Sequence, residues 1–217
     1  MKDIKLSVLD LAVVTEGANA ADAIARTVRI ALHTEKLGYE RIWLAEHHNM
    51  ANIASSATAV LIGHVAGKTN TIKVGSGGIM LPNHSPLAVA EQFGTLETLY
   101  PNRIELGLGR APGTDQLTAM ALRRNFAANN YDFHANIVEL QNYFGNTNPL
   151  ARVRAFPGEG TNVPIYILGS STDSAYLAAE MGLPYAFAAH FAPAQFNTAI
   201  AIYRTHFKPS EFLQQPY

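Results

Sequence analysis

Four polar side chains stand together at Glu46-His47-His48-Asn49, directly after an apolar run, Arg41–Leu44, that is typical of a strand. Such groups at the end of a buried strand cost free energy unless they are solvated or used. Histidine titrates near neutral pH, so His47 and His48 are candidate general acids or bases, with Glu46 as a third catalytic candidate. The alternative is that one histidine only hydrogen-bonds loop backbone. Adjacent histidines on an extended segment point in opposite directions, and EHH differs from the HExxH zinc motif, so the sequence predicts no metal site.

A glycine-rich segment follows the third apolar run, Ile72–Val74. Its residues Ser76, Gly77 and Gly78 permit unusual backbone conformations and the close approach of a flat ligand. The pattern is neither GxGxxG nor a P-loop, so taken alone it is weak evidence for a cofactor.

Two further strand ends carry groups that suit an anion. Gly109 and Arg110 follow the run Arg103–Leu106, and an arginine among small residues can make a two-pronged contact with a phosphate. After the run Val163–Leu168, hydroxyl groups and free N–H groups lead into a helix, as in phosphate sites. The residues there are Gly169, Ser170, Ser171 and Ser174. A surface ion pair and simple helix capping are the alternatives, but the two loops together favour one shared phosphorylated ligand.

Two aromatic residues complete the candidates. His190 follows the sixth apolar run and places another imidazole at the same rim. Trp43 lies within a strand, and we interpret it as a core residue rather than a platform for a ligand.

Six apolar runs alternate with helix-like segments, which predicts a parallel sheet with helices outside. The runs are Lys5–Leu9, Arg41–Leu44, Ile72–Val74, Arg103–Leu106, Val163–Leu168 and Tyr185–Ala188. Helices are expected near residues 24–38 and 54–66, in a segment that begins at residue 86, and over residues 114–144 in two pieces broken near Asn129-Asn130. Two more are expected, one that ends at residue 181 and one over residues 193–207. Because polar residues follow nearly every strand, a TIM (β/α)8 barrel is favoured over a doubly wound sheet, where they would gather at one switch point.

Composition narrows the class of protein. The 217 residues are expected to form one domain covering about the first six units of the barrel, truncated before a seventh strand. Sixteen basic and seventeen acidic residues give a net charge of −1, which disfavours a nucleic-acid partner. Cysteine is absent, which excludes disulfides and thiolate chemistry. No stretch approaches the ~20 apolar residues of a membrane span, so we expect no membrane partner and a cytoplasmic location.

Four motifs together resemble the bacterial luciferase-like monooxygenase family, and the similarity covers essentially the whole chain. They are WLAEHHN, GSGGIMLPNHSPL, RIELGLGRAPGTD and IYILGSS. Within the family, the chain looks closest to a bacterial branch with EHHN, LPNHSPL and LGRAPG. The resemblance implies a TIM barrel, reduced FMN supplied by a separate flavin reductase, and O₂. It also implies a small organic substrate, with aldehyde-like compounds as one class, and a homodimer.

The resemblance assigns roles to individual residues. His47 matches the histidine that luciferases use in the reaction of reduced flavin with O₂, and Glu46 and His48 would support it. Gly77-Gly78 matches a pair joined by a cis peptide next to the flavin ring. Arg110 matches the phosphate-binding arginine, and Ser170, Ser171 and Ser174 match the helix entry that holds the same phosphate. Two alternatives stay open: a deazaflavin-dependent oxidoreductase that transfers hydride, and a non-catalytic flavin-binding protein of the same fold.

Overall fold

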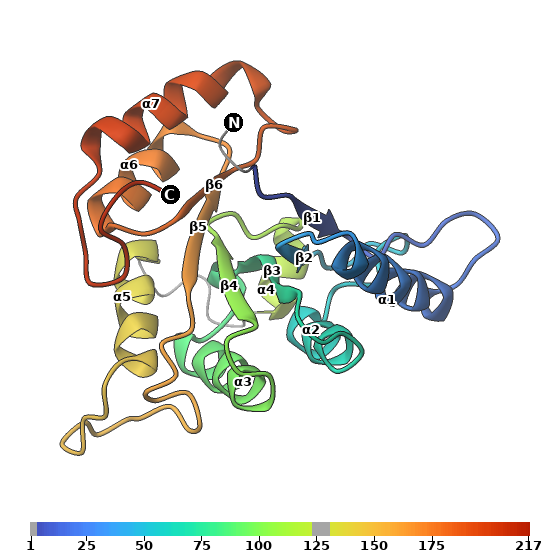
Figure 1. Cartoon of the computed structure of the whole chain (residues 1–217), viewed down its shortest axis with the longest axis horizontal. Coiled ribbons are helices and arrows are strands. Elements are labelled where there is room, and N and C mark those ends of the chain that lie inside the picture. Colours follow the sequence, from blue (N-terminus) through green and yellow to red (C-terminus); the bar gives the residue numbers. More distant parts are fainter. Residues whose placement is uncertain (1–3, 123–130) are drawn as a thin grey trace.

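A computed structural model of the chain describes residues 4–122 and 131–217. Its centre is a six-stranded parallel sheet in the order β1-β2-β3-β4-β5-β6. The strands are β1 (Ser7–Asp10), β2 (Arg41–Leu44), β3 (Lys73–Met80), β4 (Ile104–Gly109), β5 (Ile165–Gly169) and β6 (Tyr185–Phe187). The sheet curls into part of a barrel with the helices arranged around its outside (Figure 1). The predicted series of six βα units is confirmed.

Each strand is followed by helical structure. The helices are α1 (Ala20–Lys36), α2 (Thr58–Ala66), α3 (Pro86–Leu99), α4 (Gln116–Leu122), α5 (Phe133–Phe144), α6 (Thr172–Met181) and α7 (Phe196–His206). Short 3-10 turns, η1 (Leu81–Asn83) and η3 (Pro193–Gln195), precede α3 and α7. Proline at the first position of α3 and left-handed Gly182 after α6 bound these helices as the sequence predicts. The predicted break near Asn129-Asn130 lies outside the described residues.

Strands β3 and β4 extend further than predicted, and they include glycines that we assigned to loops. The extension has a steric cause, because the two backbones lie very close together. A Cβ atom added to Gly75 would lie 2.3 Å from the Glu105 carbonyl oxygen, and one added to Gly107 would lie 2.2 Å from that of Ser76. Only glycine fits at these positions, so β3 and β4 remain paired up to the edge of the sheet.

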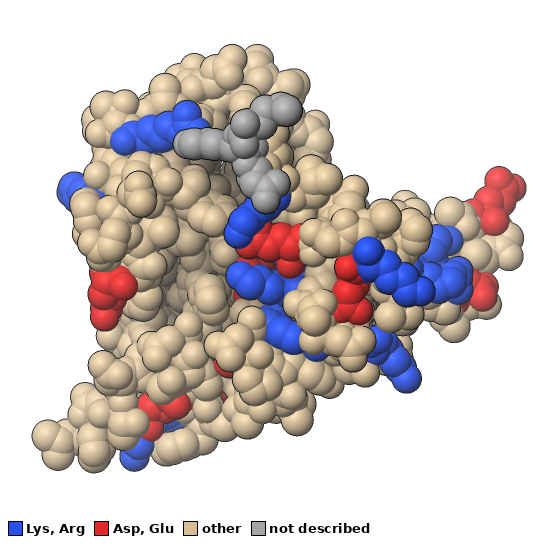
Figure 2. Space-filling view, in the orientation of Figure 1, with Lys and Arg blue, Asp and Glu red and all other residues tan. Residues whose placement is uncertain are grey.

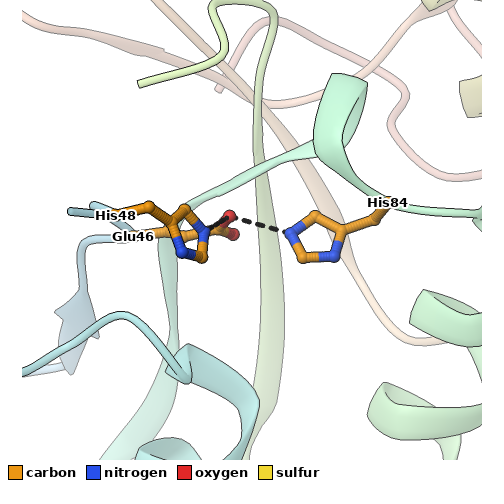
Figure 3. Close-up of side chains that lie close together, drawn as sticks. All are labelled: Glu46, His48 and His84. Carbon is orange, nitrogen blue, oxygen red and sulfur yellow. Dashed lines mark hydrogen bonds and ion pairs between the residues drawn. The ribbon is translucent and has the colours of Figure 1, made fainter. Parts of the chain in front are cut away.

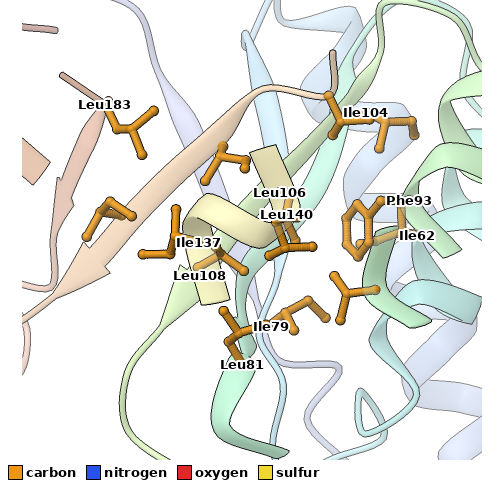
Figure 4. Packing of buried hydrophobic residues seen from close by; sticks show 14 of the residues in the cluster. Ile62, Ile79, Leu81, Phe93, Ile104, Leu106, Leu108, Ile137, Leu140 and Leu183 are labelled. Atoms are coloured by element: carbon orange, nitrogen blue, oxygen red, sulfur yellow. The ribbon is translucent and has the colours of Figure 1, made fainter. Parts of the chain in front are cut away.

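The hydrophobic core lies between the outer face of the sheet and the surrounding helices (Figure 4). Strand residues Leu106 and Leu108 pack there with Ile62 of α2, Phe93 of α3 and Ile137 of α5, all of them fully buried. Side chains alternate along a strand, so the residues between them point to the inner face of the curl. Strand residues that pack in this core are unavailable for a site, so only the residues between them can line the inner face of the curled sheet.

Glu35, near the end of α1, ties this helix to the turn before β3. Its Oε1 accepts hydrogen bonds from the backbone N–H groups of Asn70, Thr71 and Ile72 at 2.6–3.0 Å. Burial would raise the pKa of Glu35, but these N–H groups favour the charged form more strongly and lower the pKa to about 2.

We expect Glu35→Gln to lower the free energy of unfolding by about 1–2 kcal/mol at neutral pH, a value reduced for the exposure of the site. A depressed pKa stabilises the fold above the ordinary value of 4.5, and this contribution is lost as the pH falls toward 2. Urea unfolding of the parent and of Glu35→Gln, at several pH values from neutral down to 2, measures this difference in the free energy of unfolding. Glu16→Gln, at an exposed position, is the control. A difference that stays constant as the pH falls toward 2 would contradict the assignment.

The surface matches the balanced composition. On the face seen in Figure 2, basic and acidic side chains are interspersed, and no broad area of one sign is visible. Among the described residues, no helix is long and apolar enough to cross a membrane.

Candidate active site

A cavity of about 490 Å³ lies inside the curl, at the carboxyl ends of the strands. This volume falls within the range of small-molecule sites. Ten of the site residues predicted from the sequence line it: His47, Gly77, Gly78, Gly109, Arg110, Gly169, Ser170, Ser171, Ser174 and His190. They come from five different strand ends, so the fold brings these motifs together in one pocket.

Three other predicted residues do not line the cavity. Ala45 and His47 face it, so the intervening Glu46 and the following His48 point to the opposite side of the segment. Ser76 is buried, and its hydroxyl donates a 2.8 Å hydrogen bond to the Gly107 carbonyl of the neighbouring strand. We therefore carry only His47 forward as the catalytic candidate, and we assign Ser76 to the pairing of β3 with β4.

His47 is held by the loop that follows β4. Its Nδ1 lies 3.4 Å from the Gly113 carbonyl oxygen, and the Thr114 hydroxyl donates to the His48 carbonyl oxygen at 3.2 Å. A carbonyl oxygen only accepts hydrogen bonds, so the contact favours the neutral tautomer with its proton on Nδ1. In this tautomer Nε2 is free to accept a proton, and after protonation it can donate one.

Glu46 lies between two imidazoles on the outer side of the same segment (Figure 3). Its Oε1 is 2.6 Å from Nε2 of His48 and 2.8 Å from Nε2 of His84, and its Oε2 accepts a hydrogen bond from the Met80 backbone N–H. Burial would raise the pKa of Glu46, but hydrogen bonds from His84, His48 and Met80 outweigh it and lower the pKa. His84 was not predicted as a partner of Glu46, because the two residues lie 38 positions apart along the chain.

Trp43 lines the cavity, so our interpretation of it as a core residue was wrong. Below it, Glu105 is buried and accepts hydrogen bonds from the Trp43 indole N–H at 2.9 Å and from the Tyr166 hydroxyl at 3.1 Å. Arg41 Nε lies 2.8 Å from the same carboxylate. Burial and the Glu105 charge both raise the pKa of Tyr166, which keeps its hydroxyl protonated. This network fixes the indole as a rigid part of the cavity floor.

Another part of the cavity lining combines a positive charge with the start of a helix. Arg110 is 56% exposed, and its guanidinium lies 3.6 Å from the Asp173 carboxylate in the first turn of α6. Ser171 precedes α6, but its side chain does not cap the helix. The Ser174 hydroxyl donates to the Ser171 carbonyl at 2.7 Å, so it holds the turn in place. Backbone N–H groups at an uncapped helix start attract anions.

The Gly77–Gly78 peptide is cis, as the family resemblance predicts. Close packing against backbone also requires glycine at position 78, whereas at position 77 the nearest atom is the end of the Leu9 side chain. A Cβ atom on Gly77 would lie 2.7 Å from Leu9 Cδ1, and one on Gly78 would lie 2.7 Å from the Gly107 carbonyl oxygen. The backbone itself therefore forms this wall of the cavity.

A family model for luciferase-like monooxygenases matches residues 4–211. The chain belongs to this family. An Escherichia coli (strain K12) protein named luciferase-like monooxygenase is 55% identical over 216 residues, covering 100% of this chain and 64% of the relative. The N-acetyl-S-alkylcysteine monooxygenase of Bacillus subtilis (strain 168) is 38% identical over 230 residues, covering 94% of this chain and 69% of the relative. The luciferase-like chain thus spans about two thirds of the length of these relatives.

Solved structures share the fold. Apo-MsnO8 superposes with a TM-score of 0.92 at 37% identity, over 99% of this chain and 64% of that protein. Two more distant matches, both 16% identical, show the fold alone. The oxygenating constituent of 3,6-diketocamphane monooxygenase in complex with FMN has a TM-score of 0.72, over 96% of this chain and 64% of that one. An F420-dependent secondary alcohol dehydrogenase has a TM-score of 0.60, over 93% of this chain and 63% of that one. The chain is therefore a part of a TIM barrel of the luciferase-like type.

Proposed function

We propose that the protein is a flavin-dependent monooxygenase that uses reduced FMN and O₂ to oxidise a small organic substrate. The observation that carries the proposal is one cavity that joins an apolar floor, an imidazole and an anion-binding end. Family membership supports an oxidoreductase or monooxygenase role. Supply of the reduced cofactor by a separate flavin reductase, and assembly as a homodimer, belong to the same proposal.

The residues present fit FMN. Gly77, Gly78 and Gly109 leave backbone exposed along one wall, where a flat ring can lie against it. Arg110 and the uncapped start of α6 supply a cation and N–H donors for the phosphate. A distant protein of the same fold was solved in complex with FMN, so a fold of this kind can hold this ligand.

The bound cofactor would supply the oxygen chemistry, and the chain would bind, orient and shield it. Trp43, Leu9 and Leu168 would exclude water from the inner part of the cavity. His47 would accept or donate a proton through Nε2 at the reacting atoms, while its Nδ1 stays bonded to Gly113. Arg110 and the start of α6 would hold the phosphate.

A deazaflavin is the second candidate cofactor, because a distant dehydrogenase of the same fold depends on F420. Calorimetric titration of the protein with FMN and with F420 separates the two. We expect the protein to bind FMN at least about tenfold more tightly than F420. We also expect O₂ consumption with reduced FMN to rise when a panel of aldehydes and other small organic compounds is added. Tighter binding of F420, with no oxygen uptake, would support hydride transfer instead. Tight FMN binding with no turnover of any compound would support flavin binding without catalysis.

A further inference from the structure

We propose that Glu46, His48 and His84 form a binding site for one divalent transition-metal ion of the zinc type, on the outer side of the segment that carries His47. One carboxylate and two imidazoles converge there from two different loops (Figure 3), and the three ligand atoms all lie within 4.8 Å of one another. None of the three residues lines the cavity, so the inference does not depend on the proposed function.

The donor set suits zinc and related ions. Two imidazole nitrogens and one carboxylate oxygen are common ligands of Zn²⁺, whereas Mg²⁺ and Ca²⁺ prefer oxygen ligands throughout. Zinc bonds of about 2.0–2.1 Å separate neighbouring ligand atoms by roughly 3.3 Å in a tetrahedron. The two Nε2–Oε1 distances are 2.6 and 2.8 Å, so the imidazoles would move back by about half an ångström or slightly more to admit an ion.

The cluster is prearranged and open to solvent. The Glu46 side chain is only 1% exposed, and the Met80 backbone N–H fixes its second oxygen, as outer contacts orient ligands in metal sites. The side chains of His48 and His84 are 14% and 28% exposed, so the cluster reaches the surface through its two imidazoles. For an ion to bind, the proton on each Nε2 would move to Nδ1 of the same ring or to solvent, which frees the Nε2 lone pair for the metal.

Binding would link two segments that meet at the rim. His48 follows β2, and His84 follows η1 at the end of β3. The sequence predicts no metal site because His47 and His48 diverge. That argument holds for the adjacent pair, but the fold brings in His84 as the second imidazole.

The test uses the protein without a histidine tag, after dialysis against a chelator. We expect Co²⁺ to give visible absorption bands that saturate at one ion per chain, and Zn²⁺ to abolish them by displacement. His84→Ala and His48→Ala should each weaken Zn²⁺ binding in calorimetry by at least about tenfold, because the loss of even an outer contact costs 10–100-fold. His64→Ala, an exposed histidine on α2, is the matched control and should bind as the parent does.

Two results would overturn the proposal. One is a parent protein that binds neither Co²⁺ nor Zn²⁺, which would leave the cluster as a hydrogen-bonded trio only. The other is binding that survives both His48→Ala and His84→Ala. Glu46→Gln is a weaker probe because this residue is buried, so circular dichroism must first show that the variant is folded. Each histidine is partly exposed but contacts the buried Glu46, so circular dichroism must also show that His48→Ala and His84→Ala are folded before their binding is compared.

Discussion

His47→Ala should reduce turnover by about 10²–10⁴-fold, the usual loss when a general acid or base is removed. The FMN dissociation constant should change by less than about fivefold, because His47 contributes at most one neutral hydrogen bond worth ~1 kcal/mol to binding. The difference between the two effects follows from geometry. His47 lines the cavity with its ring against the Gly113 carbonyl, whereas Arg110 and α6 supply the charged contacts. Stopped-flow turnover and FMN titration on one preparation measure both quantities.

His48→Ala is the matched control, since it lies on the same loop and points away from the cavity. If the segment matters only for folding, both variants should melt at lower temperature and keep full turnover per folded molecule. If His47 acts at the reacting atoms, its variant should keep the parent's melting temperature within a few degrees and lose turnover. A stable His47→Ala protein with full turnover would remove this residue from the mechanism, and His190→Ala would then be the next variant to test.

The order of the elements could be predicted because the apolar runs are short, regularly spaced and separated by clear helix signals. Arg41–Leu44 is a strand with the predicted bounds. The ends of β3 and β4 could not be predicted, because glycine has low strand propensity and its role there depends on how close the neighbouring backbone lies. The distance between the two backbones is set by the folded sheet, so it cannot be predicted from the local sequence.

The side of each strand on which a polar residue lies was predictable in part. Trp43, Ala45 and His47 are spaced two apart and all line the cavity, so an alternation argument could have separated His47 from Glu46 and His48. It would also have moved Trp43 from the core to the cavity. The partnership of Glu46 with His84 could not be read from spacing, because it depends on how the loops after β2 and β3 meet.

Arg110→Ala should raise the FMN dissociation constant by about 10- to 150-fold, because a charge-assisted hydrogen bond to phosphate contributes ~1.5–3 kcal/mol. The lower part of this range is expected, since the side chain is 56% exposed and already lies 3.6 Å from the Asp173 carboxylate. Riboflavin lacks the phosphate, so its affinity should stay within about twofold. Arg110→Lys retains the charge and loses the planar guanidinium group, so its FMN dissociation constant should lie between those of the parent and of Arg110→Ala.

Asp173→Asn separates the role of the arginine from that of its ion pair. The Asp173 carboxylate competes with phosphate for Arg110 and adds negative charge beside the start of α6. Removing that charge should therefore leave FMN binding unchanged or tighten it, by up to about fivefold for an exposed pair worth ~1 kcal/mol at most. Fluorescence titrations of FMN and riboflavin against all four proteins give the comparison. Equal losses for the two ligands in Arg110→Ala would mean that the arginine shapes the cavity and does not contact the phosphate.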